Sequence, residues 1–235
     1  MPINKLEIPA RLAKESNSDF AFRVLRDNIM QLNLEPGEIL NDYQLAEALQ
    51  ISRTPVREAF MCLRLQRLVE SYPQSHSYVT KINLNFVDEG IFLRHSIEYR
   101  MIKEAIKVAT STDIARLQTN LAQQKHALDA GDPRLFILLD REFHHSFFLI
   151  AEKPLCWENL QQITTHHGRI QPLVISSGDD NVEMLLPYQE HCMIFEWLVN
   201  GDLPSEFDQF LFKHIGYRRL LPLLLNKHGE YFEKN

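Results

Sequence analysis

Cysteine, glycine and long apolar runs are scarce in this chain, and each shortage excludes a class of protein. Its three cysteines, Cys62, Cys156 and Cys192, are scattered and include no Cys-x-x-Cys pair. Such a set argues against a disulfide framework or a structural zinc knuckle and fits a reducing compartment. The first residues lack a basic segment followed by an apolar core, and no apolar run approaches the ~18 residues of a membrane span. We therefore expect a soluble, cytoplasmic protein that does not bind membranes.

An excess of positive charge is also missing. The 235 residues carry a formal net charge of −6, and residues 1–80 hold 9 Lys and Arg against 10 Asp and Glu. Bulk charge therefore does not indicate a nucleic-acid partner, and any DNA affinity must depend on a few well-placed arginines. With only 8 glycines and strong helical periodicity, the chain is expected to be mainly α-helical.

Well-placed arginines occur on a helix predicted to begin after Ser52 and to run to about Arg67. Ser52 is expected to cap it through its side-chain oxygen, and Pro55 lies in the first turn, where a missing N–H costs little. Three arginines fall within one stripe about 40° wide: Arg53, Arg57 and Arg64. A separate stripe is apolar: Val56, Ala59 and Leu63. A helix with these two faces suits the major groove of DNA, although three arginines alone also fit an ordinary solvated helix face.

The segments around this helix favour the DNA-binding interpretation. Residues 1–17 read as a mobile arm, and residues 18–82 as a winged helix-turn-helix domain of three helices and a two-stranded β wing. Asn41 is the predicted cap of the second helix, with Gln44 as its capping-box partner. The wing is predicted from two β-favouring runs: Leu68–Tyr72 and Tyr78–Ile82.

Three segments of this domain resemble the amino-terminal domain of the GntR family of bacterial transcription regulators: Leu34–Glu38, Leu45–Leu49 and Ile51–Ala59. The resemblance implies that the second helix, the arginine helix and the wing contact an operator half-site in double-stranded DNA. The implied contacts are Tyr43, Gln44, Ser52, Arg53, Thr54, Pro55, Arg57, Arg64 and His76. The wing loop, Gln74–Ser77, departs from the family pattern because it lacks the usual glycine and basic residues. Contact with the minor groove would then depend on the charge of His76.

Residues 83–235 are predicted to form a second domain, an antiparallel α-helical bundle. Gly131 ends one helix, Asp132 and Pro133 begin the next, and Gly201 ends another. The six predicted helices are 84–109, 112–130, 133–152, 155–175, 181–200 and 204–226.

Four polar side chains lie within apolar stripes of this bundle: Asp140, His144, His191 and His214. A carboxylate and three imidazoles directed into a core are costly unless they are paired. One divalent cation would satisfy all four, because imidazole suits zinc, nickel or iron and a carboxylate completes the set. A single histidine on an apolar face is more often a hydrogen-bonded core residue, so the prediction rests on the whole set.

These positions resemble the metal-binding pattern of the FCD-type effector domain found in the FadR branch of the GntR family. The pattern is carried by Asp140–His144, by Glu190 with His191, and by Lys213–Ile215. The resemblance implies a divalent metal at the bottom of a ligand cavity, with zinc favoured and nickel, manganese or iron as alternatives.

The same domain has a candidate effector contact on its first helix. By resemblance, Arg94 and Glu98 would bind an effector carboxylate, for which a guanidinium fork is well shaped. Arg169 is a second candidate for the pocket wall. An exposed i,i+4 ion pair explains Arg94 and Glu98 equally well.

Together these features predict a ligand-responsive transcription regulator that binds a palindromic operator as a homodimer. A small carboxylic-acid metabolite would be sensed beside the metal and would favour one dimer geometry. A metal sensor, in which the ion itself is the effector, remains open. A helical metallo-enzyme is the last alternative, but the di-iron spacing Glu142-x-x-His145 has no second copy, and neither His-Glu-x-x-His nor Gly-x-Ser-x-Gly occurs. We therefore expect no enzymatic activity.

Overall fold

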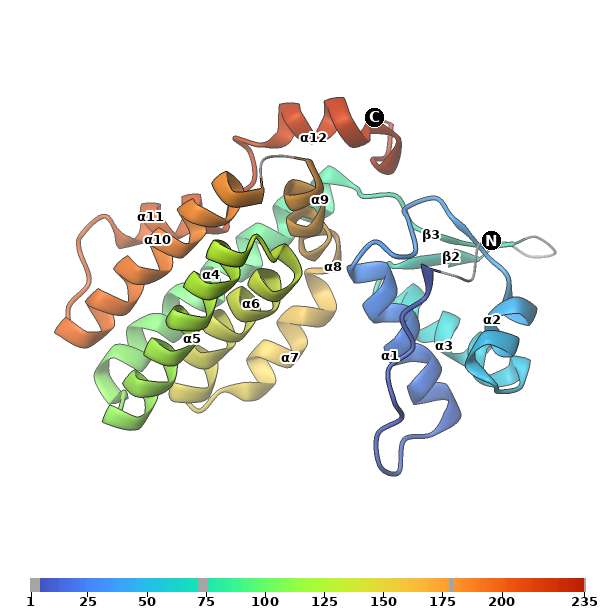
Figure 1. Ribbon diagram of the computed structural model, residues 1–235, viewed down its shortest axis with the longest axis horizontal. Coiled ribbons are helices and arrows are strands. Elements are labelled where there is room, and N and C mark those ends of the chain that lie inside the picture. Colours follow the sequence, from blue (N-terminus) through green and yellow to red (C-terminus); the bar gives the residue numbers. More distant parts are fainter. Residues whose placement is uncertain (1–4, 72–75, 178–179, 235) are drawn as a thin grey trace. The chain divides into compact units, whose positions relative to one another are not determined.

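Helices make up most of the protein and are divided between two units. The computed structural model describes residues 5–71, 76–177 and 180–234 (Figure 1). The first unit runs to Val87 and also takes in Thr165–Arg169 and the segment from His228 on. The second unit consists of Asp88–Thr164 and Ile170–Lys227. The predicted boundary at residue 82 is therefore five residues early, and two later segments belong to the first unit.

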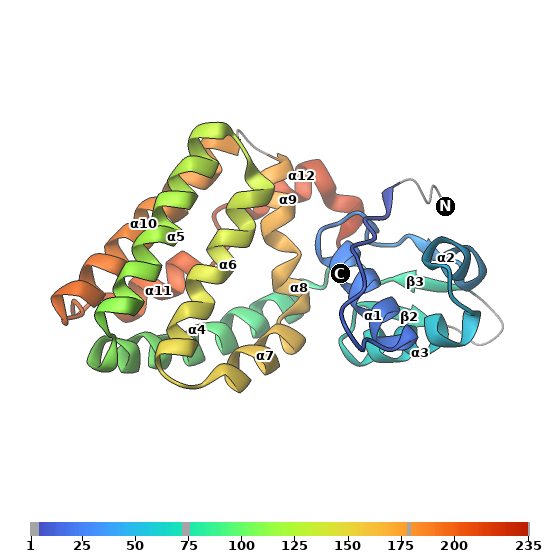
Figure 2. The same cartoon turned by 60° about the horizontal axis from the view of Figure 1, so that its bottom comes forward.

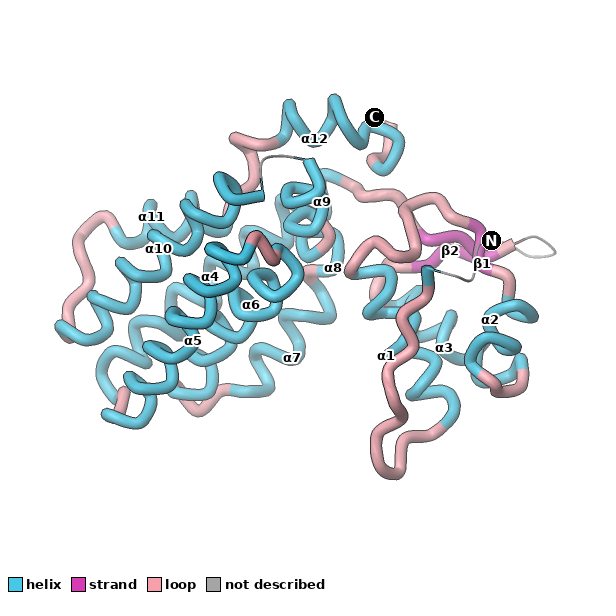
Figure 3. Tube along the Cα trace, in the orientation of Figure 1, coloured by secondary structure: helices cyan, strands magenta, loops and turns pink. Residues whose placement is uncertain are grey.

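The first unit is a winged helix-turn-helix, as predicted. Its helices are α1 (Asn17–Met30), α2 (Asp42–Leu49) and α3 (Arg53–Leu65). Its antiparallel sheet has the strand order β1-β3-β2, with β1 (Ile39–Leu40), β2 (Val69–Ser71) and β3 (Ser77–Val79) (Figure 3). The helices close over a core of fully buried side chains that includes Val24, Leu45, Val56 and Leu63. Strand β1 was not predicted, because two residues are too few to show an alternating pattern.

The two predicted helix caps have different outcomes. The Asn41 side chain accepts hydrogen bonds from the backbone N–H groups of Tyr43 and Gln44, at 3.0 and 3.2 Å, so it caps α2 as expected. Gln44 contributes its backbone N–H to this cap, but the capping box predicted from its side chain is not formed in the described structure. Ser52 occupies the N-cap position of α3, but its side chain forms no capping hydrogen bond. The side-chain cap expected from Ser52 was therefore wrong.

The segment before α1, predicted as a mobile arm, is attached to that helix from residue 5 on. The backbone of Glu7 exchanges hydrogen bonds of 2.8 Å with the Asn28 side chain. Arg23 forms an ion pair of 2.7 Å with Glu15, and Leu6 packs against the core. These contacts fix the segment where the sequence showed only a polar stretch without a period. Residues 1–4 lie outside the described part of the chain.

The second unit is a bundle of helices (Figure 2). The helices of the second unit are most of α4 (Leu84–Val108), α5 (Ser111–Ala130), α6 (Pro133–Ile150), α7 (Pro154–Ile163), α9 (Ile170–Ser177), α10 (Asp180–Asn200), α11 (Phe207–Ile215) and α12 (Leu221–His228). α5 packs against both α6 and α10. Within the described ranges, no helix is long and apolar enough to cross a membrane.

Two of the predicted helices are interrupted. The segment 155–175 is divided into α7, the short α8 (Thr165–Gly168) and α9. Pro172 contributes to this, because it has no N–H to bond to the carbonyl of Gly168. The segment 204–226 is divided at Gly216, whose extended backbone (φ −74°, ψ 154°) ends α11. Each break contains only a single glycine, Gly168 or Gly216, and an isolated glycine is a weak sign of a helix end.

Candidate DNA-binding surface and metal centre

An open cleft of about 520 Å³ lies against α3 in the first unit, bordered by α2 and the wing strands. Five of the nine residues predicted to contact DNA line it: Tyr43, Arg53, Arg57, Arg64 and His76. The other four do not line the cleft and lie at the starts of α2 and α3: Gln44, Ser52, Thr54 and Pro55. Ser52 and Thr54 are exposed, while Gln44 and Pro55 are half-buried. Five of the nine predicted contacts thus share one surface of the helix-turn-helix.

Arg53 and Arg57 share the carboxylate of Asp42, in the first turn of α2. Arg53 Nη2 donates to both carboxylate oxygens, at 3.1 and 3.0 Å, and Arg57 Nε donates to Oδ2 at 2.7 Å. Burial raises the pKa of Asp42, but the hydrogen bonds from Arg57 and Arg53 outweigh it and hold this pKa below its ordinary value. The two arginine side chains remain 51% and 63% exposed, so they are oriented and still accessible.

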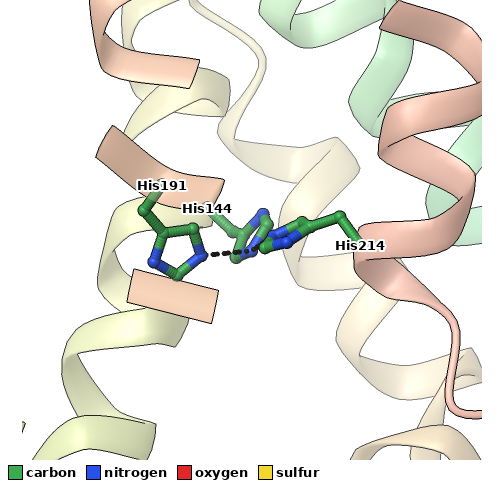
Figure 4. Close-up of side chains that lie close together, drawn as sticks. All are labelled: His144, His191 and His214. Atoms are coloured by element: carbon green, nitrogen blue, oxygen red, sulfur yellow. Dashed lines mark hydrogen bonds between the residues drawn. The ribbon is translucent and has the colours of Figure 1, made fainter. Parts of the chain in front are cut away.

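Three histidines from three helices of the second unit meet at one point: His144 on α6, His191 on α10 and His214 on α11 (Figure 4). His144 Nε2 lies 3.3 Å from His191 Nε2 and 3.2 Å from His214 Nε2. The ligand atoms of the three rings all lie within 4.8 Å of one another, and the side chains are almost fully buried. The structure therefore brings together three of the four predicted metal ligands.

Each of these imidazoles has a side-chain oxygen atom of another residue facing its Nδ1 nitrogen. The facing oxygens lie at 2.7 or 2.8 Å: Glu98 Oε2 for His144, Gln124 Oε1 for His191 and Glu190 Oε2 for His214. The Gln124 and Glu190 oxygens can only accept, so their hydrogen bonds place a proton on Nδ1 of His191 and His214 and leave a lone pair on Nε2. For His144, the ion-pair distance to the Glu98 carboxylate favours the same arrangement. Outer partners of this kind fix the ring orientation of metal-binding histidines.

Three lone pairs that face one another repel, and a cation between them would remove that repulsion. Zinc–nitrogen bonds of ~2.0–2.1 Å place neighbouring nitrogens roughly 2.8–3.4 Å apart, the lower limit at right angles and the upper at tetrahedral angles. The observed separations of 3.2 and 3.3 Å fit this range. Burial, and then the neighbouring imidazoles, lower the pKa of His191 well below its ordinary value, which keeps the ring neutral. The donor set therefore fits a divalent metal ion.

Asp140 and the Arg94–Glu98 pair lie next to the histidines. Asp140 is nearly buried, and its Oδ1 lies 3.5 Å from His191 Nε2, outside the tight group of three. Arg94 Nε donates to Glu98 Oε1 at 2.5 Å, and these side chains are only 17% and 2% exposed. The alternative of an exposed surface ion pair was therefore wrong. Burial raises the pKa of Glu98, but Arg94 and then His144 outweigh it and lower this pKa to about 2.

Arg169 has a different position from the one predicted. It belongs to the first unit and is fully buried. Its Nη1 donates to the Thr80 carbonyl at 2.7 Å, and its Nη2 lies 3.3 Å from Thr80 Oγ1 and 3.1 Å from His166 Nδ1. The neighbouring histidines suggested a pocket wall, but the short helix α8 directs this guanidinium onto Thr80. We therefore leave Arg169 out of the candidate effector site.

Sequence reasoning missed three residues that support these sites. Gln124 interrupts an apolar stripe of α5, which is the pattern that identified the histidines, so it could have been found. Glu190 directly precedes His191 and was noted without a role. Asp42 could not be found in this way, because its contact with Arg53 and Arg57 depends on how the turn between α2 and α3 folds.

Comparison with known proteins decides the family. Residues 17–79 match the bacterial regulatory proteins of the gntR family, and residues 89–205 match the FCD domain. The HTH-type transcriptional repressor RspR of Escherichia coli (strain K12) is 32% identical over 181 residues, which cover 77% of this chain and 78% of RspR. The chain belongs to the GntR family.

Other relatives of this GntR regulator agree. The Nta operon transcriptional regulator of Aminobacter aminovorans is 30% identical over 207 residues, covering 86% of this chain and 94% of that protein. The solved structure of E. coli McbR/YncC has the same fold, with a TM-score of 0.76 and 22% identity over 91% of this chain and 99% of that one. Because both domains and these relatives belong to transcription regulators, the GntR protein is a DNA-binding transcription regulator and not an enzyme.

The family matches cover the two candidate sites unequally. All nine predicted DNA contacts fall within the gntR match at residues 17–79. The FCD match at residues 89–205 includes Arg94, Asp140, His144 and His191 but ends before His214. The inclusion of His214 therefore rests on its distance of 3.2 Å from His144.

Proposed function

We propose that this GntR regulator controls operator binding through a metal-centred effector site in its FCD domain. His144, His191 and His214 would hold one divalent ion, zinc by preference, with Asp140 as a fourth ligand after a small movement. Nickel, manganese or iron are the alternative metals. The observation that carries the proposal is the convergence of three Nε2 lone pairs, each fixed by an acceptor behind Nδ1.

The proposed effector is a small carboxylic acid. When bound, the metal would supply a positive charge that attracts a carboxylate. Arg94 supports this choice, because the hydrogen bond found for it in the described part of the chain uses Nε alone. Its terminal Nη groups could therefore donate two parallel hydrogen bonds to the oxygens of one carboxylate. Glu98 acts indirectly, since it orients both Arg94 and His144.

On the DNA side, we propose a homodimer that reads a palindromic operator. Arg53, Arg57 and Arg64 would contact base edges or phosphates from the recognition helix α3, and Tyr43 the backbone. The cleft that these side chains share supports one continuous DNA-facing surface. An effector would then act by favouring one spacing of the two recognition helices.

A second candidate is a metal sensor in which the ion is itself the effector. The burial of His144 and His191, which are 2% and 0% exposed, favours this alternative because little surface is left for an organic ligand. The two candidates differ in what changes operator affinity. A metal sensor responds to the ion alone, whereas a metabolite sensor responds to a carboxylic acid only when the metal is present.

Titration of fluorescent operator DNA separates these candidates. Metal-stripped and Zn²⁺-loaded protein would be compared, each with and without a panel of small carboxylic acids. We expect affinity to change only in the loaded protein, with the change lost in His144→Ala and retained in His126→Ala, an exposed histidine on α5. Equal affinities under all conditions would reject both forms of the proposal.

A further inference from the structure

The short linker from β3 to α4, Thr80–Asn83, is held by residues from far along the chain. Arg169 donates to the Thr80 carbonyl at 2.7 Å, and the Asn83 N–H donates to His166 Nδ1 at 3.1 Å. His166 lies on α8 and Arg169 directly follows that helix, and both belong to the same unit as the linker. The guanidinium is fully buried, so its bond to a carbonyl has no competition from water.

The last described residues, His228–Lys234 (the tail), hold the middle of the linker. The Ile82 N–H donates to the Tyr231 carbonyl at 2.8 Å, and the Glu233 N–H donates to the Ile82 carbonyl at 3.0 Å. This parallel β-bridge buries the side chains of Ile82 and Phe232, which are 0% and 2% exposed. The side-chain amide of Asn83 also donates a hydrogen bond to the Glu233 carboxylate. The tail is thus joined to the linker by backbone bonds and an apolar contact.

Further contacts tie the tail and α8 to the body of the winged helix. Burial, followed by a hydrogen bond with Glu35, raises the pKa of Tyr231 to about 12. Thr165 Oγ1 donates to the Gln66 carbonyl at 2.8 Å. A Cβ at Gly168 would lie 2.5 Å from Cε of Met30, so α8 approaches α1 as closely as a residue without a side chain allows. Both segments are therefore integral parts of the first unit.

The chain passes between the two units four times, after Val87, Thr164, Arg169 and Lys227. A winged helix attached by one linker would reorient freely, because a short flexible segment imposes little geometry. Here a single residue joins α8 to α7 on one side and to α9 on the other, and the tail follows α11 and α12. α11 carries His214, one of the proposed metal ligands. A movement of α11 can therefore reach the tail along the chain, and the linker through the hydrogen bonds of the tail.

We propose that the tail and α8 form a regulatory latch on the linker. Docked, the latch makes the orientation of the winged helix follow the effector domain. Released, it frees the winged helix, and operator binding no longer responds to the metal site. The regulatory part of this inference rests on the proposed function, whereas the clamping of the linker does not.

Amide hydrogen exchange and operator binding on the full chain test the latch. In Phe232→Ala, we expect exchange of the Ile82 amide to rise about tenfold or more, while amides of the core helix α3 keep their protection. The change in operator affinity caused by Zn²⁺ should fall to less than about half of the wild-type change. Tyr231→Phe removes only the phenol contact with Glu35 and should give a smaller shift in the same direction. Lys234→Ala, an exposed tail residue, is the matched control.

Each outcome has a defined meaning. Unchanged linker exchange in both variants overturns the latch, and so does a freed linker with a full metal response. If the α3 amides of Phe232→Ala also lose their protection, the whole winged helix is destabilised in that variant. The latch is then judged from the linker exchange and metal response of Tyr231→Phe. A wild type whose operator affinity ignores Zn²⁺ rejects the proposed function instead, and linker exchange alone then decides whether the clamp exists.

Discussion

At the scale of single residues, Asp42 would explain how an acidic chain presents the arginines of the proposed recognition helix in a defined way. Its carboxylate fixes the directions of Arg53 and Arg57 before DNA arrives, which lowers the conformational entropy lost on binding. It also removes one unit of net positive charge from the recognition surface. Both effects favour specific over non-specific binding, because non-specific affinity depends on charge alone.

Replacing Asp42 tests this function. In Asp42→Asn we expect tighter binding to random DNA, a steeper salt dependence and a smaller ratio of specific to non-specific affinity. Arg53→Ala and Arg57→Ala should instead lose about 1–3 kcal/mol of specific binding each, with an unchanged circular dichroism spectrum. Lys14→Ala, an exposed lysine of the same unit, is the control. An Asp42→Asn protein with unaltered specificity would show that the ion pairs do not position the arginines.

His166 gives the first unit a predictable sensitivity to acid. Burial and then the Arg169 guanidinium lower its pKa to about 3, and its Nδ1 accepts hydrogen bonds that a protonated ring would lose. The unfolded chain therefore binds a proton between pH ~6.5 and 3 that the folded chain does not. The free energy of unfolding should fall by up to about 1.4 kcal/mol per unit as pH decreases through this range, with no contribution above it. Urea denaturation should give a shallower pH slope for His166→Gln than for wild type, and parallel slopes would refute the assignment.

At the scale of elements, the two helix caps of the helix-turn-helix make a matched pair. Asn41→Ala removes a side chain that bonds two backbone N–H groups of α2, so we expect a loss of about 1 kcal/mol in the free energy of unfolding. Ser52→Ala should cost little stability, since Ser52 forms no capping bond, but should weaken operator binding if Ser52 contacts DNA. Thermal denaturation and operator titration of both variants would separate the two roles. Equal losses of stability would contradict the observed capping.

The elements that were predicted correctly are those whose sequence pattern is local. The helices α1 to α6 and the wing follow from periodicity, caps and turn residues, all visible within a dozen positions. The breaks at Thr164–Arg169 and at Gly216 were missed because each contains only a single glycine and no proline, and an isolated glycine is a weak sign of a helix end. The attachment of the segment before α1 was missed because Asn28 and Arg23, which hold it, lie on the next helix.

The candidate metal site was predicted from the chemistry of its side chains, because the sequence does not show which residues are in contact. A buried imidazole is costly without a partner, so three of them in apolar stripes indicated a shared partner, and their Nε2 atoms do converge. Arg169 shows the limit of this reasoning. Its neighbours in sequence suggested the same pocket, but its partner Thr80 is 89 residues away and no local pattern connects them.

At the scale of the whole molecule, a dimeric regulator must match its operator in spacing. Two recognition helices related by twofold symmetry contact half-sites about one helical turn apart, or a multiple of it. Inserting five base pairs between the half-sites turns one of them to the opposite face of the DNA. We expect this change to lower affinity to the non-specific level, while a ten-base-pair insertion restores part of it. Equal affinity for all three spacings would argue that single chains bind independently.

The central claim is that the histidine cluster holds a metal through which the FCD domain controls DNA binding. Its most direct test is the metal content of the purified, untagged protein, measured by elemental analysis for wild type, His144→Ala, His191→Ala and the control His126→Ala. We predict about one divalent ion per chain in wild type and control, and almost none in the two cluster variants. Wild-type protein that takes up no metal, even after incubation with zinc or nickel, would contradict the claim and leave the three histidines as a structural part of the core.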